Sequence, residues 1–185
     1  MKKLVLPVAS MFLALSILTA CKHKQKELID SSIDIVSLSK NQLVNIADAI
    51  IEGIVISQEV QNDFRGLPAT DTTIKVTKVY KGNPGEQIKV RVDGGETDDK
   101  IYTSDETMLP KFTKKESVVL FVTANKGQRP DKNDFDYYVV GQFQGKFEIK
   151  DGKIINRTFS FDRNNFVNEL QTIENENKMN PPAKL

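Results

Sequence analysis

Residues 49–60, AIIEGIVISQEV, carry the clearest sign of the chain's architecture. Their isoleucines and valines are β-branched and apolar, which favours a long strand. Gly53 stands in the middle of the run, where a glycine indicates a β-bulge or a sharp coil. A strand needs such a bend when it serves two sides of a closed barrel. These residues therefore predict a barrel built around one long, coiled strand.

Further strand patterns follow along the chain. In residues 70–81 the alternation of apolar residues breaks, which indicates a bulge near Thr77 or burial of both faces. Residues 117–124 are almost continuously apolar, as expected of a central strand buried on both sides. Asp151-Gly152 stands between two strand-like runs and is the strongest short signal for a hairpin. The other predicted strands span residues 87–92, 137–143, 145–150 and 154–155.

Two amphipathic helices flank the predicted strands. Ser39 and Gln42 have the spacing of a capping box, so a short helix is expected over residues 40–47. Near the C-terminus, apolar residues at helical spacing from Phe166 to Ile173 predict a second helix. The fold class is therefore mainly β (α+β): a small antiparallel OB-like barrel of five or more strands, flanked by a short N-terminal helix and a C-terminal helix.

The N-terminal segment has the features of a secretory signal. Lys2 and Lys3 precede an uncharged apolar run over residues 4–18, which is shorter than the roughly 20 residues of a membrane-spanning helix. The run ends in Leu18-Thr19-Ala20-Cys21, which resembles the lipobox of bacterial lipoproteins. That resemblance implies a diacylglyceryl group on Cys21, cleavage just before it, and anchoring at the extracytoplasmic face of a bacterial cell membrane. An ordinary cleaved signal with a chance cysteine, or an uncleaved anchor, are the alternatives.

These patterns divide the chain into four parts. After the leader, a polar stretch that begins with basic residues separates the anchor from the first helix, and beyond Glu174 the sequence becomes polar again. The expected parts are a signal peptide at 1–20, a flexible tether at 21–38, an OB-like barrel domain at 39–175 and a disordered tail at 176–185.

Composition excludes several classes of function. The mature chain carries 24 basic and 25 acidic residues, and this balance argues against a partner that is a nucleic acid. Cys21 is the single cysteine, so the domain has no disulfide. The single histidine, His23, lies outside the domain, which argues against histidine-based triads and zinc sites. No cofactor is expected, and the domain is predicted not to be an enzyme.

The order of the strand motifs resembles that of a known fold family. Residues 47–55, ADAIIEGIV, and 74–82, IKVTKVYKG, look like the opening of netrin-like and TIMP-like OB barrels, and secreted bacterial proteins show a similar order. The likeness covers about residues 43–155. Animal inhibitors of this fold use a free N-terminal cysteine to chelate a protease zinc. Because Cys21 would be acylated here, the resemblance implies the fold and not the inhibitory activity.

Two groups of residues are candidates for binding. Four acidic residues at short spacing could hold Ca²⁺, although a solvated loop is the alternative that we favour: Asp93, Glu96, Asp98 and Asp99. Aromatic residues gather near the last strands, where most belong to the barrel core. Alternating side chains must still point outward, and Tyr138 and Gln144 are the candidates for an exposed ligand-binding face.

These observations favour a membrane-anchored, non-enzymatic module that binds an extracytoplasmic protein or a small ligand. An inhibitor of an extracellular protease is the first alternative. A hydrolase that uses carboxylate chemistry, with Asp98 and Asp99 as candidates, is the second.

Overall fold

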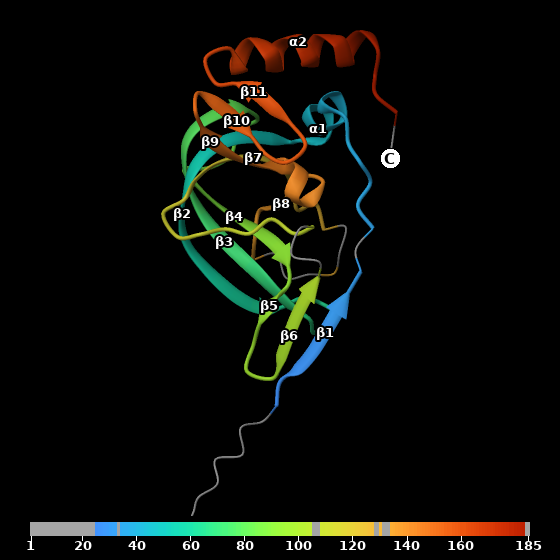
Figure 1. Ribbon diagram of the computed structural model, residues 1–185, viewed down its shortest axis with the longest axis vertical. Coiled ribbons are helices and arrows are strands. Elements are labelled where there is room, and N and C mark those ends of the chain that lie inside the picture. The colour runs from blue at the N-terminus through green and yellow to red at the C-terminus, as the bar shows by residue number, and fades with distance from the viewer. Residues whose placement is uncertain (1–24, 33, 105–107, 128–129, 131–133, 184–185) are drawn as a thin grey trace, which may run out of the picture.

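The computed structural model describes residues 25–32, 34–104, 108–127, 130 and 134–183, so Cys21 and the leader lie outside the described residues (Figure 1). The chain is mainly β, with a closed five-stranded barrel, a short helix on the N-terminal side and a C-terminal helix. In chain order the elements are β1 (Glu27–Ser31), α1 (Lys40–Ile46), β2 (Ala49–Asn62), β3 (Pro68–Lys81), β4 (Gln87–Asp93), β5 (Gly95–Glu96), β6 (Lys100–Ser104), β7 (Ser117–Ala124), β8 (Tyr137–Val139), the 3₁₀ helix η1 (Gln142–Gly145), β9 (Lys146–Lys150), β10 (Lys153–Ile155), β11 (Ser160–Asp162) and α2 (Phe166–Met179).

The barrel closes through the strand order β7-β2-β3-β4-β8, with β8 pairing back onto β7. Four of these contacts are antiparallel, as predicted, and the β4–β8 contact is parallel. In a closed ring the number of antiparallel contacts must be even, because the strand direction must return to its starting value. Five strands therefore require at least one parallel contact, and the barrel is mixed.

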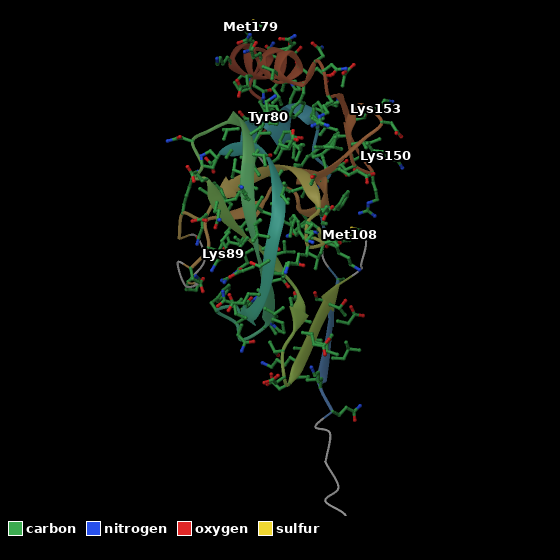
Figure 2. All side chains as sticks on the ribbon, turned by 90° about the vertical axis from the view of Figure 1, so that its left-hand side faces the viewer. Tyr80, Lys89, Met108, Lys150, Lys153 and Met179 are labelled. Carbon is green, nitrogen blue, oxygen red and sulfur yellow. The ribbon has the colours of Figure 1, made fainter. Side chains whose placement is uncertain are left out.

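Two hydrophobic cores lie on the two sides of the barrel wall. The inner core includes Ile51, Val118 and Leu120, and the outer core includes Ile50 and Phe121. β2 and β7 thus send alternate residues to opposite cores, which explains their almost continuous apolar sequences and confirms the prediction that 117–124 is buried on both faces. β9, β10, β11, α1 and α2 enclose the outer core (Figure 1). Tyr80, labelled in Figure 2, contacts Phe166 of α2 at a centroid distance of 4.8 Å.

The bend of β2 depends on Gly53. The register between β2 and β3 shifts next to Gly53, where Thr77 is the extra residue on β3, so the bulge predicted near Thr77 is confirmed. A Cβ atom on Gly53 would lie 2.5 Å from Cγ2 of Ile74 and 2.8 Å from the carbonyl oxygen of Lys75. Only a residue without a side chain allows the two strands to approach this closely.

Replacing Gly53 by alanine should destabilise the barrel. We expect G53A to lower the free energy of unfolding by about 1–3 kcal/mol, because the new methyl group meets backbone as well as the Ile74 side chain. Chemical denaturation followed by circular dichroism measures the change. G85A is the matched control, since its Cβ would meet only Gln87 O at 3.3 Å. Equal stability of G53A and the native protein would contradict this account of the bend.

Two predicted boundaries are wrong. The segment expected to be a flexible tether, 21–38, contains β1, which pairs in parallel with β6, and its Leu38 is buried. The tail expected from residue 176 is helical as far as Met179, and the buried Asn177 donates to the carbonyl oxygen of Asn41 at 2.9 Å. Both segments are polar in sequence, and their order comes from tertiary hydrogen bonds that local composition does not reveal.

The predicted strand over 137–143 is also shorter than expected. β8 ends at Val139, because Gly141 and Gln142 have positive φ angles of 59° and 56° and turn the chain into η1. The hairpin predicted at Asp151-Gly152 is present, and it joins β9 to β10 with φ angles of 50° and 73°, as the primed turns of two-residue hairpins require.

Candidate functional site

A cavity of about 300 Å³ lies at one end of the barrel, where β2 and β4 end and β3 begins. We call this end the mouth. Strand residues of the barrel form one wall, and β5 and β6 form a second with Gly95, Tyr102 and Thr103. The segment 109–112 forms the third wall; Met108, labelled in Figure 2, immediately precedes it. Val92 and Phe112 line the cavity and also belong to the inner core, so the cavity is the unfilled end of the barrel interior.

The most unusual group in the cavity wall is the hydroxyl of Thr72. Thr70 and Thr72 line the cavity and Ile74 belongs to the inner core, so these three residues share the inward face of β3. Thr70 Oγ1 donates to the carbonyl oxygen of Gly94 at 2.7 Å. Thr72 is 0 % exposed, and within the described part of the chain its Oγ1 is the buried side-chain polar atom without a hydrogen-bond partner. Such a group is costly in a protein interior and calls for an explanation.

Loss of the hydroxyl should change the free energy of unfolding in opposite directions at Thr72 and at Thr70. We expect T72V to raise the free energy of unfolding by about 1–3 kcal/mol, because valine has the same shape and removes an unsatisfied buried group. T70V should lower it by about 1 kcal/mol, because the bond to Gly94 is lost. Thermal denaturation of both variants measures the difference. A T72V variant less stable than the native protein would show that the hydroxyl has a partner.

Charged residues at the rim of the mouth are paired. Asp63 Oδ1 accepts hydrogen bonds from the backbone nitrogens of Arg65 and Leu67 at 2.8 and 2.9 Å, and Arg65 Nη2 lies 2.6 Å from Asp63 Oδ2. Burial raises the pKa of Asp63, but the hydrogen bonds from Leu67 and Arg65 outweigh burial and hold the pKa below its usual value. Arg65 Nη2 also lies 3.7 Å from Asp93 at the cavity wall.

A buried ion pair lies on the opposite side of the same wall. Asp71 and Arg91 are register partners on β3 and β4, and their side chains are 1 % and 2 % exposed. Arg91 donates from Nε and Nη2 to the two carboxylate oxygens at 2.7 Å each, and its guanidinium lies 4.1 Å from the ring centroid of Phe135. Arg91 Nη2 also donates to Asp134 at 3.1 Å. The pair joins the two strands directly behind Thr72.

The structure does not bring the predicted binding pair Tyr138 and Gln144 into the cavity. Tyr138 is half-buried on β8, and its ring packs against Phe135 at 4.8 Å. Gln144 is 2 % exposed, so the prediction that it faces solvent is wrong. Its Nε2 donates to the carbonyl oxygen of Val36 at 3.0 Å, and its Oε1 accepts from the backbone nitrogen of Leu38 at 2.9 Å. Gln144 therefore binds the N-terminal segment to the barrel.

The candidate calcium site is not assembled. Asp93 lines the cavity beside Arg65, Glu96 pairs with Lys26 at 2.7 Å, and Asp99 accepts from Thr97 Oγ1 at 3.0 Å. Asp98 is exposed at the turn between β5 and β6. Among the described residues, no three or more His, Cys, Asp or Glu side chains form a group that could hold a metal ion. Short spacing in the sequence does not bring these carboxylates together, because a strand and a turn direct them to different partners.

Sequence reasoning missed Thr72 and the cavity. The available signal was the position of Thr72, two residues before the apolar Ile74 on the inward face of a predicted strand. A threonine is an ordinary strand residue, so this signal is weak without the barrel around it.

No protein-family model matches the chain, and the search of curated proteins finds no similar sequence. The described residues include no helix that is both long and apolar enough to cross a membrane. The geometry of the mouth is therefore the basis on which a function can be argued.

Proposed function

We propose that this chain is a membrane-anchored, extracytoplasmic lipoprotein whose barrel is a non-enzymatic module that binds a small ligand in the mouth cavity. The observation that carries the proposal is a concave, largely apolar cavity with a buried hydroxyl that lacks a partner in its wall. Binding sites for small molecules combine an apolar lining with a few polar groups, and volumes from about 300 Å³ are typical.

The N-terminal segment begins beside the cavity wall, and this limits the distance between the mouth and the proposed anchor at Cys21. Lys26 Nζ lies 2.7 Å from Glu96, and the backbone nitrogen of Glu27 donates to the carbonyl oxygen of Asp99 at 2.8 Å. β1 therefore begins beside the hairpin of β5 and β6, which forms one wall of the cavity. Cys21 precedes Glu27 by six residues, and even a fully extended chain of that length spans only about 22 Å. A lipid on Cys21 would hold the mouth close to the membrane surface.

The alternatives are less well supported by the geometry. Asp98 and Asp99, the carboxylates considered for a hydrolase, lie at the exposed hairpin turn and do not line the mouth cavity. For a protease inhibitor, no feature of the described residues provides a specific argument.

The anchor is tested directly at Cys21. The chain produced in a bacterial host should be recovered in the membrane fraction, and intact-mass measurement should show a mature protein that begins with a diacylated Cys21. C21A should lose the lipid and fail to be cleaved at this position, because the thiol is the attachment site. An unmodified Cys21, or a native chain that still begins at Met1, would contradict the anchoring proposal.

Ligand binding is tested by native mass spectrometry of the lipoprotein purified in detergent from the membranes in which it is produced. We expect a non-covalent adduct of low mass on the native chain. Gln58 lies at the exposed rim of the cavity, so Q58W should block entry and abolish the adduct without disturbing the inner core. E59W is the matched control, because Glu59 is the next residue on β2, is also exposed, and does not line the cavity.

The binding proposal fails if the native chain carries no adduct, either as purified or after incubation with a metabolite extract. It also fails if Q58W retains the adduct as well as E59W does.

A further inference from the structure

We infer the chemical class of the ligand: the mouth cavity takes a small, uncharged, mainly apolar molecule with one hydrogen-bonding group that pairs with Thr72. This inference rests on the proposed function, since it assumes that the cavity is the binding site. It follows from three properties of the wall, namely the apolar surface, the position of the charges and the buried hydroxyl.

The apolar character of the ligand follows from the side chains that the cavity shares with the core. Val92 and Phe112 are buried, and the half-buried Leu109 packs against the inner core to which they belong. A ligand that covers these side chains is stabilised because apolar surface is removed from water. The cavity is at the lower limit for small-molecule sites, so the ligand has the size of one or two rings or a short chain.

That the ligand is uncharged follows from the positions of the ionisable residues around the cavity. Within the described lining, the charged side chains are Asp93 and Lys111. Lys111 is exposed, and Asp93 has Arg65 at 3.7 Å. Thr70 and Val92, the lining residues nearest to Thr72 on β3 and β4, are uncharged. A charged group placed there would lose its hydration without gaining a counterion, which is strongly unfavourable.

The polar group of the ligand follows from Thr72. A threonine hydroxyl can both donate and accept, so an alcohol, a phenol or a carbonyl would satisfy it. Thr72 is 0 % exposed, so a ligand reaches it only if part of the wall moves. Leu109 is the side chain best placed to move, because it is half-buried and lies outside the helices and strands. On binding, the wall opens slightly and the Thr72 hydroxyl forms a hydrogen bond with the ligand.

The test uses 1-naphthol and naphthalene, which share an apolar ring system and differ by one hydroxyl. Each is titrated by fluorescence into the full lipidated chain in lipid nanodiscs, with empty nanodiscs as background. 1-Naphthol should bind the native chain roughly tenfold more tightly than it binds T72V, the size expected for one neutral hydrogen bond. Naphthalene should bind both chains with the same affinity. T72V is a suitable variant because valine preserves the shape of the wall.

The remaining outcomes separate this inference from the proposed function. Equal binding of 1-naphthol to the native chain and T72V would overturn the role of Thr72, and tighter binding of 1-naphthoate than of 1-naphthol would overturn the uncharged class. If neither naphthol nor naphthalene binds while the native adduct is present and lost in Q58W, the ligand class is wrong and the proposed function stands. If the native chain carries no adduct and binds neither probe, the proposed function is wrong as well.

Discussion

Closure of a five-stranded ring is the constraint on which the rest of this structure depends. An odd number of strands cannot alternate in direction around a closed ring, so one neighbouring pair must be parallel, and here it is β4 and β8. Both strands run towards the mouth. In the ring, β8 lies between β4 and β7. The connection from the end of β4 to the start of β7 therefore passes over the mouth of the barrel. Within the described residues, 94–104 and 108–116 belong to this connection and contribute β5, β6 and the segment 109–112. The cavity is thus bounded by the connection from β4 to β7.

The two-sided wall explains which parts of the fold were predictable. β-branched runs predicted β2, β3, β4 and β7 with nearly correct ends, because all four strands contribute apolar residues to the inner core and β2 and β7 also contribute to the outer core. Gly53 and Thr77 marked the bend in the right place. The parallel contact of β8 was not predictable, since β8 has only three residues and its partner β4 lies more than forty residues earlier. Local sequence predicted a strand over 137–143, but it contains no sign of the distant strand with which β8 pairs.

The candidate site was harder to predict for a related reason. Gln144 looked like a surface residue, yet its amide is buried because backbone groups of Val36 and Leu38 provide its partners. The acidic residues from Asp93 to Asp99 looked like a cluster, yet each has a different environment. The partners of Gln144, Asp93 and Glu96 come from segments remote in sequence. Polar residues carry little periodic signal, so their roles emerge only when the topology places partners beside them.

The position of the Asp71–Arg91 pair bears on how the cavity could work. A buried ion pair contributes little net stability, because removing two charges from water offsets most of their attraction. Its two parallel hydrogen bonds do define geometry, and they join β3 to β4 one residue from Thr72. This wall is therefore held in one register, while the wall at 109–112 has no strand pairing to hold it. A rigid wall that carries an unsatisfied hydroxyl, opposite a wall that can yield, favours a ligand over simple filling of the core. On the proposed function, the Thr72 hydroxyl supplies a hydrogen-bonding group for the ligand that a valine of the same shape would lack.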